Sequence, residues 1–225
     1  DRLLARPYDE GIALTDLAMV YRGSGRYRHA LATLDRAEPL FEPSPDASDH
    51  DREAWATYLG NRGWTLLRAR RHGLLPATSE ELATAFETSL AIHRDAGRVL
   101  WVANELMNLA TLALQDGDAP AARTRIVEAR EVLGDDVSFE HRGYLLALEG
   151  ELALVEGDPA AAMDAFAELG EVEGRWSARW WADFGRARAH VAAGRPGDAD
   201  AAFEQALEAL EGAAAALDPL VDRPY

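Results

Sequence analysis

Three asparagines are the side chains in this sequence best suited to holding another polypeptide. A side-chain amide offers both a hydrogen-bond donor and an acceptor, so it can bind the backbone of an extended peptide whatever that peptide's sequence. The three are Asn61, Asn104 and Asn108, and the chain has no others. Asparagines in helices also bond to their own helix or to water. Their role therefore depends on which face of the fold they occupy.

The residues expected of an enzyme do not come together in the sequence. No HExxH, P-loop, G-x-S-x-G or dinucleotide-binding motif occurs. His50-Asp51 and Glu140-His141 are pairs that chance explains, and His190 stands where a buried core histidine is expected. We therefore expect a protein that is not an enzyme and has no catalytic residue, metal site or cofactor. The six histidines are scattered over different segments: His29, His50, His72, His93, His141 and His190.

Charge and composition exclude several classes of partner. The net charge is -16 and the pI is about 4.7, so phosphate backbones and anionic membrane surfaces are repelled. There is no cysteine, which excludes disulfides and thiolate metal sites. All 23 basic residues are arginine, a usage that suggests a high-GC bacterial genome. The chain begins with Asp1 rather than Met, so we expect a processed or excised piece, and the cytoplasm is the expected compartment.

The stretch from Leu106 to Ala129 reads as one helical hairpin. Gly117-Asp118 separates two segments in which apolar residues recur every three or four positions, as on one face of a helix. The first of these faces comprises Leu106, Leu109, Ala110 and Ala113, and the second comprises Ala122, Ile126 and Ala129.

Four other stretches share the phase of this hairpin. Each has a small residue where two helices would touch, and in four of the five copies another small residue follows 12 positions later. Thr78 with Glu81 predicts a capping box after an insertion at 74–77, and Asp158-Pro159 predicts a helix start. The first small residues are Ala18, Gly63, Ala110, Gly150 and Ala187. The predicted hairpins of this single domain, 1–225, span about 8–41, 51–95, 98–132, 138–169 and 175–211, with a tail at 212–225.

This pattern resembles the tetratricopeptide repeat, a helix-turn-helix unit of about 34 residues. The repeats here are longer, leucine replaces the consensus tryptophan, and the closing proline is mostly absent. The resemblance implies an all-α, right-handed superhelix of about five stacked hairpins with a concave groove. Similar long repeats follow DNA-binding or ATPase modules in bacterial transcription regulators. The residues that carry the resemblance in the first copy are Leu14, Leu17, Ala18, Tyr21, Gly25, Tyr27, Ala30, Leu34 and Ala37.

In such arrays the first helix of each hairpin lines the groove, and the repeat register assigns residues to that face. All three asparagines fall on it. The aromatic side chains there would form apolar pockets or, alternatively, ordinary core between repeats. The predicted groove residues are Asn61, Trp64, Asn104, Met107, Asn108, Thr111, Tyr144, Trp181, Phe184 and Arg188, with Thr15, Met19 and Glu151 on the same side.

Two further clusters are unusual. Trp180 and Trp181 point about 100° apart on a helix, so we expect at least one of the tryptophans at 176, 180 and 181 to be exposed. Arg68, Arg70, Arg71 and His72 would complement the dipole at a helix C-terminus, or would anchor an acidic partner.

The sequence predicts a module that binds a peptide or protein segment, without nucleic acid or membrane. One alternative is a scaffold that self-associates into a homo-oligomer. Another is a small-molecule sensor or an enzyme that uses the aromatic groove.

Overall fold

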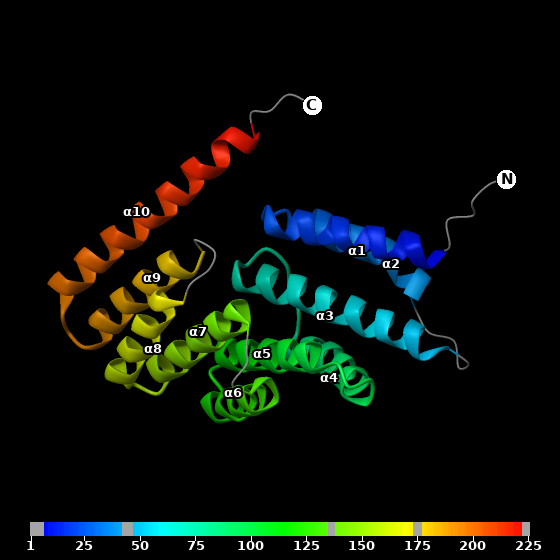
Figure 1. Ribbon diagram of the computed structural model, residues 1–225, viewed down its shortest axis with the longest axis horizontal. Helices are drawn as coiled ribbons and strands as arrows, with labels where there is room; N and C mark the ends of the chain where they lie inside the picture. The colour runs from blue at the N-terminus through cyan, green and yellow to red at the C-terminus, as the bar shows by residue number, and fades with distance from the viewer. Residues whose placement is uncertain (1–6, 42–46, 135–137, 173–176, 222–225) are drawn as a thin grey trace. The chain divides into compact units, whose positions relative to one another are not determined.

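The computed structural model describes residues 7–41, 47–134, 138–172 and 177–221. These residues form ten α-helices and no strand, which confirms the all-α class (Figure 1). The chain divides into two compact units, Asp1–Asp116 and Gly117–Tyr225. The boundary falls within the hairpin that the sequence predicts at 98–132.

The first unit contains five helices, each packed on the next along the chain. The third also packs on the first and on the fifth. This nearest-neighbour pattern is typical of a helical repeat array. The five are α1 (Pro7–Gly23), α2 (Tyr27–Phe41), α3 (Asp49–Arg71), α4 (Ser79–Asp95) and α5 (Val99–Asp116).

The second unit repeats this arrangement with five more helices. Sequential helices pack on each other, and α7 also packs on α9. The helices are α6 (Ala119–Leu133), α7 (Phe139–Val155), α8 (Pro159–Glu171), α9 (Ser177–Ala192) and α10 (Pro196–Val221). The helices of both units lie close to the predicted hairpins except at the end, where α10 continues through Gly212. The sequence predicts a separate tail there, but the alanine run that follows strongly favours helix.

Local side-chain chemistry explains where the helices start. Thr78 and Glu81 form the predicted capping box at α4. The Asp158 carboxylate accepts hydrogen bonds from two free amides at the start of α8, and Pro159 needs no such bond. Gly157 closes the turn before α8 with a φ of 77°, a conformation that side chains with a Cβ rarely adopt.

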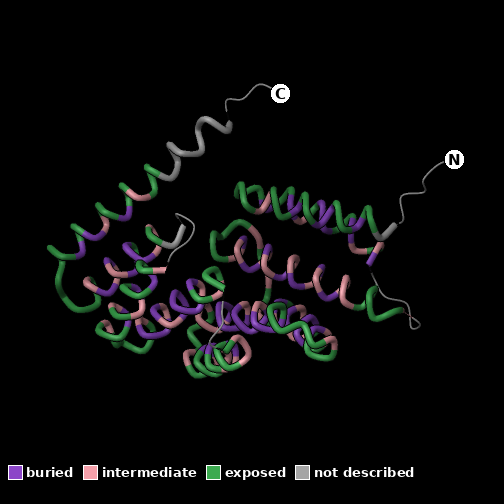
Figure 2. Tube along the Cα trace, in the orientation of Figure 1, coloured by how far each residue is buried: buried purple, intermediate pink, exposed green. Residues whose placement is uncertain are grey.

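Glycines at the predicted contact positions let phenylalanines pack against the helix backbone. A Cβ at Gly63 would lie 2.7 Å from the Phe86 ring. Phe166 lies between Gly150 and Gly185, and a Cβ at either glycine would overlap its ring. Both phenylalanines are fully buried, and buried residues follow the inner faces of the helices (Figure 2). The repeat phase read from the sequence therefore marks real helix contacts.

Candidate functional site

A pocket of about 300 Å³ opens in the first unit between α1, α3 and α5. Three of its apolar side chains are largely exposed: Ile12 at 41%, Met19 at 39% and Trp101 at 42%. Apolar side chains at the mouth of a hollow are typical of a binding pocket. The residues that line it are Ile12, Thr15, Asp16, Met19, Phe41, Ala54, Thr57, Tyr58, Asn61 and Trp101.

Helical spacing positions this lining. On α1 the lining residues recur at intervals of three and four, from Ile12 to Met19, and on α3 they do so from Ala54 to Asn61. The hydroxyls of Thr15 and Thr57 donate to carbonyls one turn earlier in their own helices. These threonines therefore already have partners for their hydroxyl protons. Asp16 keeps an exposed carboxylate with no ion pair among the described residues.

Asn61 lies at the pocket, but its amide is already engaged. Its Nδ2 donates to the Thr57 carbonyl oxygen at 3.0 Å, and its Oδ1 accepts from Arg22 Nη1 at 3.2 Å. Arg22 Nη1 also approaches the Asn61 carbonyl oxygen at 3.5 Å. Asn61 therefore holds the guanidinium of α1 against α3, in addition to facing the pocket.

A second guanidinium lies further along the same face of α3. The Arg68 guanidinium carbon is 5.6 Å from the centre of the Trp64 ring, a cation–π distance. One turn later His72 stacks on Tyr27 at 5.8 Å between ring centres. Burial, and then the positive charge of Arg68, lower the pKa of Arg22 to about 10. Arg22 therefore remains a cation at neutral pH, although its surroundings do not favour the charge.

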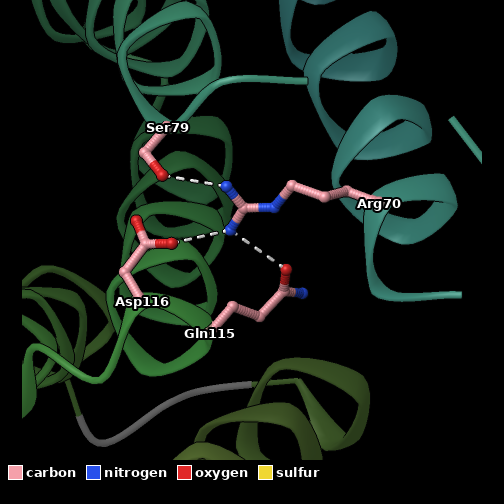
Figure 3. A network of polar contacts seen from close by, with 4 residues as sticks. All are labelled: Arg70, Ser79, Gln115 and Asp116. Atoms are coloured by element: carbon pink, nitrogen blue, oxygen red, sulfur yellow. Dashed lines mark hydrogen bonds and ion pairs between the residues drawn. The ribbon is translucent and has the colours of Figure 1, made fainter. Parts of the chain in front are cut away.

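Arg70, in the predicted basic cluster, belongs to the fold rather than to a site. Its guanidinium donates to Ser79 Oγ at 2.9 Å, to Gln115 Oε1 at 3.3 Å and to Asp116 Oδ1 at 2.9 Å (Figure 3). These three partners come from α4 and α5. Arg70 thus ties the C-terminal end of α3 to both neighbouring helices.

No family model matches the sequence, and no curated protein is similar enough to count as a relative. None of the described helices is both long and apolar enough to cross a bilayer.

Asn108 binds an inner carboxyl group. Its Nδ2 donates to Glu105 Oε2 at 3.1 Å, and Glu105 is only 2% exposed. Ser89 Oγ lies 2.9 Å from Glu105 Oε1 and 2.9 Å from the Ala56 carbonyl oxygen. A hydroxyl has one proton to donate, so a protonated Glu105 carboxyl satisfies both contacts.

Burial raises the pKa of Glu105 to about 7, and the hydrogen bonds from Asn108 and Ser89 oppose this rise. A side chain at Gly60 would overlap this carboxyl group, so the glycine makes room for it. The cluster joins α3, α4 and α5.

The remaining predicted groove residues of α5 differ in exposure. Met107 is only 1% exposed, and Thr111 is 9% exposed with its hydroxyl donating to the Met107 carbonyl oxygen. In this structure they pack inside the protein, with almost no surface left for a ligand. Asn104 is half-buried and makes no side-chain hydrogen bond to the described residues. Of the predicted set, Thr15, Met19 and Asn61 come together at the pocket.

In the second unit the predicted groove residues contact one another or a neighbouring carboxylate. Tyr144 and Trp181 lie 6.0 Å apart between ring centres. Arg188 lies 5.9 Å from the centre of the Phe184 ring and forms an ion pair with Glu151.

In the tryptophan cluster, Trp180 and Trp181 are both half-buried. Trp176 lies outside the described residues, so the expectation that at least one of the three is exposed stays a prediction.

Sequence reasoning missed seven residues of the pocket. Ile12 and Asp16 share the spacing of Thr15 and Met19 on α1, and Ala54, Thr57 and Tyr58 share the spacing of Asn61 on α3, so those two helix faces could have identified them. Phe41 and Trp101 come from two other helices, α2 and α5. Only the packing of those helices brings them to one pocket, and no spacing in the sequence marks it.

Proposed function

We propose that this chain is a non-enzymatic binding module of the tetratricopeptide type, whose first unit captures an apolar side chain of a peptide or protein segment. The pocket between α1, α3 and α5 carries this proposal. Its volume of about 300 Å³ suits one or two large side chains better than a folded surface. The shared repeat phase and the nearest-neighbour packing support the repeat type. A role in a bacterial regulator follows from the resemblance alone.

The pocket chemistry favours an apolar occupant. Covering Ile12, Met19 and Trp101 would remove apolar surface from water, which stabilises a complex by roughly 25 cal/mol per Å². The threonine hydroxyls of the lining already have partners in their own helices. The pocket therefore offers few polar groups for a sugar or a nucleotide, and much apolar surface for an aliphatic or aromatic side chain.

Selection from a displayed library of random peptides on the full chain tests the proposal. Met19→Gln should weaken the selected peptides about tenfold, because a polar amide replaces an apolar contact. Val20→Gln is the matched control, since Val20 is 67% exposed and does not line the pocket. Equal binding by both variants would refute peptide capture in this pocket. A library that yields no binder would favour a small apolar molecule instead.

Self-association is a second candidate function, and α10 favours it. Leu207 is 59% exposed and Leu210 is 44% exposed, while the described residues of α10 pack on α9 alone. Sedimentation velocity of the double variant Leu207→Glu, Leu210→Glu tests this candidate. A parent chain that remains monomeric at all concentrations would exclude it.

A further inference from the structure

Arg22 and Arg68 are cations without a carboxylate partner among the described residues. This is unexpected in a chain with a net charge of -16. Two other arginines of α3 do have such partners: Arg62 lies 3.5 Å from Asp35, and Arg70 lies 2.9 Å from Asp116. Arg52 and Arg71, the remaining arginines of α3, also lack such a partner, but they are exposed. Among the half-buried arginines that the structure describes, the lack of a carboxylate partner distinguishes Arg22 and Arg68.

The two cations converge on that face. Asn61 and Arg68 are seven residues apart on α3, which places them on the same side of the helix, two turns apart. Arg22 reaches this face from the end of α1 through its bond to Asn61 Oδ1. Trp64 lies between them in sequence, under the Arg68 guanidinium.

Arg22 retains donors for a ligand. A guanidinium has five N–H donors, and the hydrogen bonds of Arg22 to the described residues use Nη1 alone. Its Nε and Nη2 therefore have no protein acceptor there. The bond to Asn61 fixes the plane of the group, which limits the side-chain entropy lost when a ligand binds.

The electrostatics call for an anion. Arg22 is partly buried beside a like charge, and both effects disfavour its cationic form. Tyr27 opposes these two effects on the pKa of Arg22 but ranks below both. The other titratable groups at this end are the exposed Arg26, Arg71 and His72, so no carboxylate among the described residues there relieves the repulsion. Asp16, the free carboxylate of the pocket, lies six residues before Arg22, or about 9 Å along the helix axis. An oxyanion would offset the repulsion and use the free donors of a planar fork.

We propose that Arg22 and Arg68, with Asn61 holding the first of them, bind an oxyanion group, either a carboxylate or a phosphate. It would belong to the segment whose apolar side chain fills the adjacent pocket, so this inference rests on the proposed function. The ligand is then a segment with a large apolar residue close to an acidic or phosphorylated group. Asn61 belongs to both parts of the site, since it faces the pocket and bonds to Arg22.

Titration of the full chain with inorganic phosphate and, separately, with acetate tests the anion site. Arginine Nε–H and tryptophan indole signals would be followed by NMR at constant ionic strength. We expect saturable shifts at Arg22 and Arg68. Arg68→Gln should weaken binding about tenfold or more, because a charge-assisted bond is lost. Saturation by phosphate alone would identify a phosphorylated ligand, and saturation by acetate as well would identify a carboxylate.

Two controls distinguish the anion site from the rest of the protein. Arg52→Gln makes the same charge change at an exposed residue of α3, 16 positions or about 24 Å from Arg68. Arg52→Gln should leave both titrations unchanged. If it weakened anion binding as much as Arg68→Gln does, the effect would come from the net charge of the protein, and the proposal would be overturned. Shifts that never saturate would also overturn it. Met19→Gln should leave phosphate binding intact while weakening peptide capture, so failure of either proposal is seen separately.

Discussion

The two units use their arginines in different ways. In the second unit, arginines on facing helices pair with carboxylates: Arg123 with Glu156, Arg130 with Glu149, and Arg142 with Glu168. The first two pairs and Glu168 line a hollow of about 580 Å³ between α6, α7 and α8. The first unit has such pairs too, at Arg62, Arg70 and Arg98. It differs in that the half-buried Arg22 and Arg68 have no carboxylate partner among the described residues, and the neighbouring pocket is lined mainly by apolar groups.

This difference separates arginines whose charge is already paired from two that, as we propose, bind an anion. A cation that already has a carboxylate partner gains little from an added anion, because the existing pair must first be broken. An unpaired, partly buried cation gains more. If the proposed function holds, the same type of hairpin serves as structural support in one unit and as a binding surface in the other.

The first way to test the comparison is to break the common packing. Phe166 lies between Gly150 and Gly185, and Phe86 packs on Gly63. Truncating either ring to alanine should cost about 3–5 kcal/mol of unfolding free energy, because a fully buried ring leaves a cavity. Denaturant melts followed by circular dichroism measure this loss. If the units unfold separately, each variant shifts only its own transition.

Phe139→Ala is the control for the two core variants. Its ring is 62% exposed, so its removal should change the free energy of unfolding by less than about 0.5 kcal/mol. A midpoint for Phe166→Ala equal to that of the parent would contradict the packing described here.

Glu105 gives the first unit a pH dependence. Its folded pKa of about 7 lies above the ordinary glutamate pKa of 4.5, so the folded state binds more protons between these pH values. Stability is then fully present below pH 4.5 and declines as the pH rises through 7. Between pH 4.5 and pH 7 the free energy of unfolding therefore falls by roughly 3 kcal/mol, and above pH 7 it stays at the lower value. Glu105→Gln should remove most of this fall, because a neutral amide needs no ionisation.

Melts of the parent and of Glu105→Gln at pH 5 and pH 8 check this expectation. The variant should gain stability at pH 8 and little at pH 5. Glu87→Gln, on α4 but outside the cluster, should not flatten the parent's pH profile. If the free energy of unfolding changed with pH equally in the parent and in Glu105→Gln, ionisation of the Glu105 carboxyl would not destabilise the fold, and the expectation would be wrong.

The repeat phase predicted the helices and their contacts because packing needs small residues at fixed intervals. Gly63 and Gly150 were recognisable as such residues before any phenylalanine could be placed against them. The same phase placed Thr15, Met19 and Asn61 on one face, and the pocket includes all three. Local periodicity in the sequence is thus enough to predict the helices, their contacts and part of the candidate site.

The same reasoning foresaw the burial of Leu106 and Leu109 on α5, but it placed Met107 in the groove and did not assign Leu112. All four are buried, so this helix is apolar on most of its circumference, which is typical of a helix packed on several sides. The expectation that one face of this helix lines an open groove was therefore too simple. Contacts between residues far apart in sequence, such as Arg22 with Asn61 and Gly60 with Glu105, have no local signal at all.

The smallest expected effect compares one arginine from each unit. Arg70 has a side chain only 20% exposed and partners on α4 and α5, whereas the side chain of Arg130, paired with Glu149, is 63% exposed. Arg70→Gln should cost roughly 1–2 kcal/mol of unfolding free energy, and Arg130→Gln less than about 0.5 kcal/mol. The measurement is denaturant unfolding at low and at high salt. Salt should weaken the contribution of Arg130 more, because its pair is the more exposed. Equal losses at both positions would mean that the interhelical arginines of the two units are equivalent, and that only the unpaired Arg22 and Arg68 set the first unit apart.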